Sequence, residues 1–409
     1  MKVAAARVAL AGLLLAACSD GPSISDPDYR PSGEVRQLTV EERALVAATT
    51  GFGLELLRQV AADQPGNVLV SPLSVSMALG MALNGAGGET WEEMRATLGF
   101  AGLDETQINE GYRGLLNQVR LRDPAVTIGV ANSIWHDQLF TLEPVFIEQS
   151  ETYFDAEVAA LDFASASAPD AINGWVSDAT GGRIRKLIES ISPDEVAFLV
   201  NAVYFRATWS TRFDPGDTRS GSFRRADGST VTAQFMSRDG GIALAGGADV
   251  QVAELPYQDS AFSMVLAMPL AGSVDEYVAT LTAAGWDALL AQLHPREMTL
   301  RLPKFTFAMK AELSAALGAM GMPTAFTGRA DLSRLSPDPL GLYISRVQHD
   351  TWIKVDEAGT EAAAATGVGV GVTSLPPTIT FDRPFLAAIR ERDTGTILFI
   401  GIVRDPTAE

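Results

Sequence analysis

Residues 357–377 read EAGTEAAAATGVGVGVTSLPP, and they lie between two apolar, strand-like segments near the C-terminus. A helix-favouring alanine run is joined here to an alternation of glycine and valine, with no charge beyond Glu357 and Glu361. A connection of this length with almost no bulky side chain to anchor it is typical of an exposed loop. Its composition also suits a central strand, so we expect a loop that can insert into a sheet.

The strand period of two divides residues 360–372 into two faces. The residues of one face are uncharged and end in three valines: Thr360, Ala362, Ala364, Thr366, Val368, Val370 and Val372. Burying these valines would contribute about 1.5–3 kcal/mol each. The alternative interpretation is a flexible glycine–alanine linker. The poor fit of glycine to strand interiors favours that alternative.

Six further motifs resemble those of the serpin family, and they occur in the family's order. They are 67–74 (NVLVSPLS), 85–90 (GAGGET), 172–176 (INGWV) with Thr180 and Gly181, 199–205 (LVNAVYF) with Trp209, 302–305 (LPKF), and 382–386 (DRPFL) with 397–401 (ILFIG). The resemblance covers about residues 40–406. It implies an α+β serpin fold with three β-sheets, about nine helices and an exposed reactive-centre loop at about 357–377.

The resemblance also implies an inhibitor that acts as a suicide substrate. A serpin's loop is cleaved by its target protease, and the hinge of the loop then inserts into the main sheet. Insertion requires small or neutral hinge residues, and the corresponding positions meet that requirement: Glu357, Gly359, Thr360, Glu361, Ala362, Ala363, Ala364, Ala365 and Thr366. The resemblance therefore implies a protein that is not an enzyme and whose partner is a protease.

Family loop length places the scissile bond at Thr373–Ser374, preceded by Val372 and Val370. A small β-branched residue fits the shallow apolar pocket of an elastase-like protease and lacks the cation that a trypsin-type pocket binds. Inhibition of subtilisin-like or papain-like cysteine proteases stays open. So does a non-inhibitory serpin that is a protease substrate or a binding protein, because the glycines at 367, 369 and 371 depart from the usual loop.

The resemblance assigns a second set of residues to the region where the main sheet opens. Ser71, Ser74, Asn201 and His349 are expected to form a buried hydrogen-bonded node beneath the middle of the sheet, since buried polar groups must be paired. Trp209 is expected at the top of the same sheet, where ordinary core packing is a compatible role. The alternative for His349 is a catalytic base, which no neighbouring motif supports.

The N-terminus reads as a targeting segment. Lys2 and Arg7 precede the apolar run 8–17, which ends in the lipobox-like sequence LAAC at Cys18. We expect a lipoprotein signal peptide at 1–17, lipidation of Cys18, a flexible tether at 18–39 and a serpin domain at 40–409. Residue 19 is serine, which favours the outer membrane or cell surface of a bacterium over other sites. The alternative is an ordinary secretory signal and an extracellular protein.

Composition excludes several classes of function. The formal net charge of −19 and the pI near 4.6 argue against a nucleic-acid partner, which requires basic patches. The chain has three histidines without metal-ligand spacing and no G-x-S-x-G motif. Lysine and arginine are dispersed, so no site for a polyanionic activator is evident. We expect a monomer without metal or cofactor.

Periodicity predicts the main elements. We expect helices at 40–59, 74–84, 89–98 and 310–320. We expect central strands at 126–135 and 196–205, strands at 299–302 and 305–308, and hairpins that pair 251–256 with 262–268 and 385–390 with 397–403.

Overall fold

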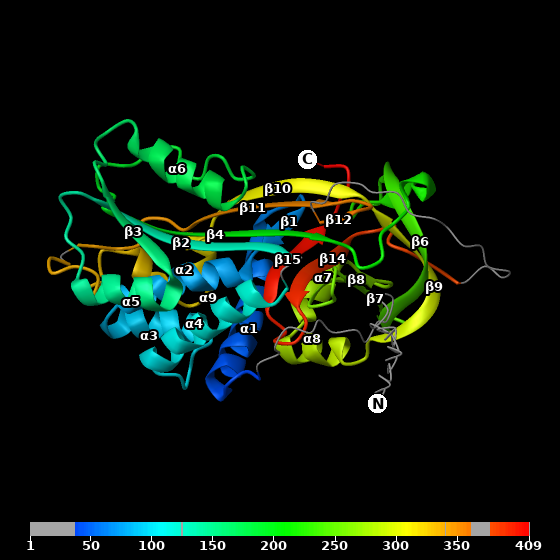
Figure 1. Cartoon of the computed structure of the whole chain (residues 1–409), viewed down its shortest axis with the longest axis horizontal. Helices are drawn as coiled ribbons and strands as arrows, with labels where there is room; N and C mark the ends of the chain where they lie inside the picture. Colours follow the sequence, from blue (N-terminus) through cyan, green and yellow to red (C-terminus); the bar gives the residue numbers. More distant parts are fainter. Residues whose placement is uncertain (1–36, 124–125, 340, 361–376, 409) are drawn as a thin grey trace, which may run out of the picture.

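The computed structural model describes residues 37–123, 126–339, 341–360 and 377–408. Within them, nine α-helices and two short 3-10 helices pack around two β-sheets (Figure 1). The predicted α+β class is confirmed. The 3-10 helices are η1 (Pro215–Asp217) and η2 (Pro323–Phe326).

The six-stranded sheet holds the segment that precedes the predicted loop. Its order is β10 (Phe305–Glu312), β11 (Gln348–Val355), β12 (Gly359–Thr360), β4 (Ala197–Thr208), β2 (Thr127–Asp137) and β3 (Ala156–Leu161). All neighbours are antiparallel except β2 and β3, which are parallel. The two-residue β12 therefore lies between two much longer strands.

The larger sheet has nine strands. Its order is β1 (Val68–Val70), β15 (Ile397–Val403), β14 (Phe385–Glu391), β8 (Phe262–Pro269), β7 (Val250–Pro256), β6 (Thr230–Gly246), β9 (His294–Pro303) and β13 (Thr378–Thr380), with β5 (Arg219–Arg224) paired to β6. The start of β6 pairs with β5 and its end pairs with β7, while β9 pairs with the stretch from Phe235 to Leu244 that links the two. This continuity joins two of the three expected sheets into one hydrogen-bonded sheet within the described residues.

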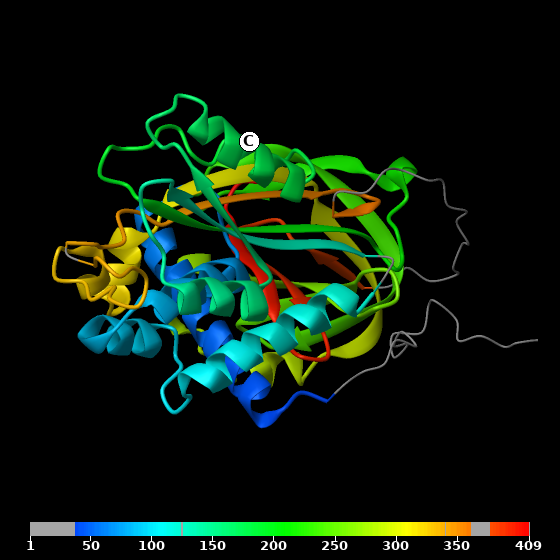
Figure 2. The same cartoon turned by 60° about the vertical axis from the view of Figure 1, so that its left-hand side comes forward.

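Helices lie on both faces of the six-stranded sheet. The helices of the described residues are α1 (Val40–Asp63), α2 (Pro72–Gly85), α3 (Gly88–Thr97), α4 (Glu105–Leu121), α5 (Pro144–Phe154), α6 (Ala168–Ala179), α7 (Val274–Thr280), α8 (Ala283–Leu290) and α9 (Ser314–Met320). Figures 1 and 2 show α6 on one face of this sheet and α2 on the other. None of the described helices is long and apolar enough to cross a membrane.

The sequence explains why α2 can lie in the centre of the molecule. Ser71 caps its first turn by accepting a hydrogen bond from the Ser74 N–H, and Pro72 takes the first helical position, where no N–H is needed. Apolar side chains surround the rest of the helix, and nearly all of its residues are buried. The helix α2 therefore packs against β4 on this face of the sheet.

Most predicted elements are found within two to four residues of their expected ends, and both predicted hairpins are confirmed. The helix predicted at 310–320 is wrong in its first part. Lys310, Ala311 and Glu312 continue β10 and pair with β11, and the helix begins at Ser314. The apolar periodicity of the helix extends back over these residues, but pairing with a distant strand determines their conformation.

Close packing of β1 against β15 gives a test of the fold. A Cβ atom at Gly401 would overlap the carbonyl oxygen of Val68, so Gly401→Ala is expected to destabilise the protein by about 1–3 kcal/mol. The matched control is Gly174→Ala on the exposed side of α6, where a Cβ meets no atom within 4 Å. Removing that helical glycine should stabilise the protein by up to about 1 kcal/mol. Thermal melting of both variants checks the pair, and equal melting points would contradict the β1–β15 packing.

Candidate functional site

The first residues of the predicted loop already belong to the six-stranded sheet. Thr360 pairs with Val355 of β11 on one side and with Ala207 of β4 on the other, and its side chain is only 3% exposed. The expectation that the whole of 357–377 is exposed is therefore wrong at its start. The physical reason is a buried partner for the Thr360 hydroxyl.

That partner is the hydroxyl group of Tyr257, which lies 2.5 Å from Thr360 Oγ1. The Tyr257 ring stacks on Trp209 with 4.5 Å between ring centroids, and Trp209 Nε1 donates a hydrogen bond of 2.9 Å to the carbonyl oxygen of Asp356. Burial raises the pKa of Tyr257 above its usual value, so the phenol stays neutral. Trp209 thus lies at the end of the sheet where β12 enters, which we call the hinge end.

Backbone geometry and charged contacts also hold β12 in place between β4 and β11. Gly359 has φ +153°, and a Cβ there would overlap the carbonyl oxygen of Ala207, so only glycine fits. Glu357 lies 2.9 Å from Lys304 Nζ and accepts a hydrogen bond of 2.6 Å from Thr218. Burial alone would raise the pKa of Glu357, but the hydrogen bonds from Thr218 and Lys304 outweigh it and hold the pKa below its usual range. The hinge is anchored on both sides of Gly359.

Three of the four residues predicted for the polar node lie together. The Ser71 N–H donates to His349 Nε2 over 3.0 Å, and Ser71 Oγ donates to the carbonyl oxygen of Leu398 over 2.6 Å while it accepts from Ser74 N. Burial lowers the pKa of His349 to about 4. The imidazole is therefore neutral and occupied as an acceptor, which does not favour a role as a catalytic base.

Asn201 is the member of the node that does not join it. It lies on β4, and its Nδ2 donates to Asn132 Oδ1 on the neighbouring strand β2. Its own Oδ1 is buried without a hydrogen-bond partner among the described residues. The predicted node is thus divided between β4 and the side of the sheet that carries His349.

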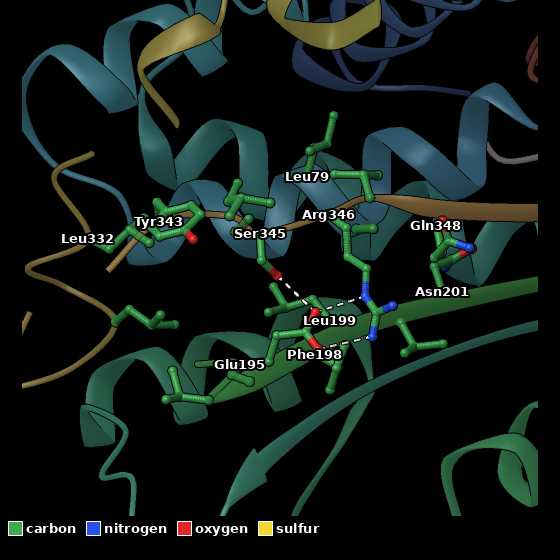
Figure 3. Close-up of a pocket in the computed structure, with 18 of the residues that line it drawn as sticks. Leu79, Glu195, Phe198, Leu199, Asn201, Leu332, Tyr343, Ser345, Arg346 and Gln348 are labelled. Atoms are coloured by element: carbon green, nitrogen blue, oxygen red, sulfur yellow. Dashed lines mark hydrogen bonds and ion pairs between the residues drawn. The ribbon is translucent and has the colours of Figure 1, made fainter. Parts of the chain in front are cut away.

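A gap separates these two sides. Among the described residues, β4 and β11 pair with β12 and not with each other. Beyond β12, a cavity of about 150 Å³ lies between β4, β11, the segment that leads into β11, and α2 (Figure 3). Both Asn201 and His349 line this cavity. The sheet therefore holds a strand-shaped position that β12 fills only at the hinge end.

The opposite end of the gap, which we call the far end, is bridged by charged side chains. Arg346 precedes β11, and its Nε lies 2.8 Å from Glu195 Oε1, just before β4. Ser345 donates to the same carboxylate, and the Arg346 guanidinium lies 5.1 Å from the ring centroid of Phe198 (Figure 3). These contacts were not predicted from the sequence. The same holds for Tyr257 and for Asn132, whereas Lys304 lies in the LPKF motif, which could have pointed to it.

Several predicted site residues lie outside the described residues. They are the remainder of the hinge, the residues of the scissile bond and its neighbours, and the lipidation site: Glu361, Ala362, Ala363, Ala364, Ala365, Thr366, Val370, Val372, Thr373, Ser374 and Cys18.

Comparison with known proteins shows which family the chain resembles. The family model described as serpin (serine protease inhibitor) matches residues 47–406. Serpin-Z7 of Hordeum vulgare is 34% identical over 390 residues, covering 90% of this chain and 98% of that protein. Iripin-2 of Ixodes ricinus is 34% identical over 374 residues, covering 89% and 94%.

Solved structures agree with that result. Native tengpin, a thermophilic serpin, superposes with a TM-score of 0.83 at 30% identity and covers 90% of this chain and 95% of its own. Human thyroxine-binding globulin, solved in complex with thyroxine, has the same TM-score at 28% identity and covers 90% and 100%. Because this fold occurs both in a family described as protease inhibitors and in a thyroxine-binding globulin, the activity of this chain must be argued from its own site.

The neutral state of His349 predicts a specific pH dependence. The usual histidine pKa of 6.5 applies to the unfolded chain, and the folded value is about 4. As pH falls from 6.5 to 4, the unfolded chain takes up the proton first, and roughly 3 kcal/mol of stability present above pH 6.5 is lost. His349→Gln keeps an acceptor for Ser71 but does not titrate. Urea unfolding at pH 7.5 and 4.5 should show a larger fall for the wild type, and parallel curves would contradict this assignment.

Proposed function

Because the chain belongs to the serpin family, we propose that it inhibits a serine-type endopeptidase by acting as a suicide substrate. One observation carries the proposal. Gly359 and Thr360 form a two-residue strand between β4 and β11. Among the described residues, no strand occupies the rest of the gap between β4 and β11. The chain that follows Thr360 needs only to continue along the same path.

The chemistry of trapping is supplied by the protease. Its serine hydroxyl attacks the carbonyl carbon of Thr373, the Thr373–Ser374 bond breaks, and Ser374 leaves as a new amino terminus while Thr373 forms an ester with the protease. The residues after Thr360 are then released at one end and add to the sheet as a strand. The protease, still esterified to Thr373, moves with the inserting loop. This movement prevents hydrolysis of the ester bond between the protease and Thr373.

The register of β12 gives the inserted position of each loop residue. Each step along the loop from Thr360 moves one residue back along β4 and one back along β11. Six steps bring Thr366 opposite both Asn201 and His349. Side chains alternate, so Thr366 would point to the same face as Thr360 and present a hydroxyl to the unpaired Oδ1 of Asn201. The divided polar node would be completed by the inserted strand.

The same register supports the proposed hinge. Residues 362 and 364 would point toward the core between Phe205 and Ile353 and between Val203 and Thr351, and all four of these neighbours are buried. Alanine is small enough for such sites, whereas a charged side chain would have to be buried unpaired. The loop sequence and the gap are therefore compatible at positions 362 and 364.

We further propose an elastase-like target and a lipid anchor. The small β-branched Thr373, preceded by Val372, fits a shallow apolar specificity pocket. The LAAC sequence that ends at Cys18 supports cleavage by a lipoprotein signal peptidase, lipidation of Cys18, and attachment to the cell envelope through the tether 18–39. The inhibitor domain would then act as a monomer at the membrane surface or, if released, outside the cell.

Incubation of the tetherless protein with elastase tests the function. We expect a complex that survives denaturing electrophoresis, together with a C-terminal fragment that begins at Ser374 in mass spectrometry. Thr360→Arg should give cleavage without complex, because a guanidinium would replace a threonine that is 3% exposed against Tyr257. Thr360→Ser keeps the hydroxyl and serves as the matched control that still traps.

Two results would contradict the proposal. Clean cleavage of the wild type by elastase and by subtilisin-like and papain-like proteases, with no stable complex, would identify a non-inhibitory serpin. Unchanged trapping by Thr360→Arg would show that entry of β12 between β4 and β11 is not required.

Lipidation is tested separately in the expressing cell. Cys18→Ser removes the thiol that would accept the lipid, so the protein should move from the membrane fraction to the soluble fraction and lose incorporation of labelled palmitate. Ser19→Ala is the control that leaves the thiol in place. Membrane association that persists in Cys18→Ser would contradict the anchor.

A further inference from the structure

The far half of the gap between β4 and β11 has a roof as well as a floor. Its floor is α2, and the cavity in the gap is lined by residues of α2 and of the segment that covers the opposite face, among them Leu187, Ile188 and Glu195. Its roof is the segment 183–195, which connects α6 to β4 and which we call the strap. The strap is held on the α6 side by Asn173, whose Oδ1 accepts from the N–H groups of Leu187 and Ile188 at 2.8 and 2.9 Å. Asn173 Nδ2 donates in turn to the Ile188 carbonyl oxygen.

The strap is also tied to the opposite side of the gap. The Arg183 guanidinium lies 5.1 Å from the ring centroid of Trp352 on β11. Lys310 on β10 donates to the Lys186 carbonyl oxygen over 2.8 Å, and Arg346 donates to the Ser190 carbonyl oxygen over 2.8 Å. Together with the Arg346–Glu195 ion pair, these contacts span the gap on the face that carries α6.

The register of β12 decides which loop residues meet this roof. Thr360 points to the core face, where its hydroxyl reaches Tyr257. Even-numbered residues of an inserted strand therefore face α2 and the cavity, and odd-numbered residues face the strap. Phe198 belongs to the same outward face, because it packs in a cluster with residues of α6 and the strap.

The valine–glycine alternation matches these two faces. On the core face, Val368, Val370 and Val372 would point toward a cavity lined mostly by apolar side chains. On the outward face the residues at 367, 369 and 371 are glycines. Nine steps from Thr360 bring Gly369 opposite Phe198 on β4 and opposite Arg346 before β11. The Arg346–Phe198 contact crosses the space into which a side chain at position 369 would project.

Glycine is a poor choice for the interior of a strand unless a side chain would meet an obstacle there. The strap and the Arg346 contacts are such an obstacle. Arg346 and Glu195 are well enclosed, with side chains 26% and 7% exposed, so the pair cannot turn aside without losing partners. Gly369 thus removes a side chain at the position where Arg346 crosses the outward face of the gap.

We propose that the far half of the gap is a roofed channel that admits a strand only where the residue facing the Arg346 bridge lacks a side chain, with residues 366–372 of this chain as the occupant. This inference rests on the proposed function, because it requires the loop to insert after cleavage. It assigns to the strap and Arg346 a role in selecting which strand can complete insertion. Gly369 then allows insertion with the Arg346–Glu195 bridge intact.

The test is Gly369→Leu, alone and combined with Arg346→Ala. Each protein is cleaved in the loop with elastase, and its melting temperature is compared with that of the uncleaved form. The number of inhibitor molecules consumed for each protease trapped is measured in parallel. The single and the double variant present the same loop to the protease, so a difference between them arises from the channel and not from recognition.

We expect the wild type to gain greatly in melting temperature on cleavage and Gly369→Leu to lose most of that gain, with a several-fold rise in inhibitor consumed. The double variant should regain most of the wild-type behaviour. An undiminished gain in Gly369→Leu, or no recovery in the double variant, would overturn the channel while leaving the inhibitory function in place.

Two outcomes in the wild type separate the channel from the function. A gain in melting temperature without any covalent complex would refute inhibition, and the variants would still decide the channel. No gain at all on cleavage would mean that the loop does not insert, and the channel proposal would fall.

Discussion

The edges of β4 and β11 that β12 leaves unpaired within the described residues are the constraint on which the rest of this structure depends. Strand edges inside a sheet carry N–H and C=O groups that require partners, and β12 supplies them only at the hinge end. A longer strand at this position would satisfy more of these groups. The proposed function therefore requires that the uncleaved protein be held by the rate of rearrangement and not by equilibrium alone.

Three sets of side-chain contacts oppose that rearrangement along the gap. At the hinge end, Tyr257 and Trp209 hold the entry of β12. Beneath the middle, Ser71 holds His349, and Asn201 is held separately on β4. At the far end, Arg346 crosses to Glu195. Each contact involves at least one side chain and is weak compared with a full ladder of backbone hydrogen bonds. The proposed insertion requires the entering strand to exchange or pass them.

Local patterns in the sequence predicted the parts of this system that depend on residue type. The burial of α2 followed from its apolar composition, whereas the small hinge residues and alternating faces beyond Thr360 lie outside the described residues and stay predictions. The contact of Ser71 with His349 followed from resemblance to a family. What could not be predicted depends on pairing between distant segments. Thr360 is buried because Tyr257 lies beside it, and Lys310 is in a strand because β11 pairs with it.

The Arg346 bridge illustrates the same limit. Neither Glu195 nor Phe198 stands out in the sequence, and their meeting with Arg346 follows only from the positions of β4 and β11 on either side of the gap. From the sequence, the glycines at 367, 369 and 371 are a departure from the usual serpin reactive-centre loop. In the proposed inserted strand they would face the side of the gap that the strap covers, and Gly369 would lie where Arg346 crosses it.

The central claim is that the gap between β4 and β11 receives the chain that follows Thr360. Hydrogen–deuterium exchange with mass spectrometry, before and after cleavage in the loop, tests it most directly, because exchange reports the pairing of backbone N–H groups. Peptides covering 197–203 and 348–353 should become strongly protected after cleavage, while peptides from the β14–β15 hairpin should change little. Unchanged exchange in β4 and β11 after cleavage would contradict it.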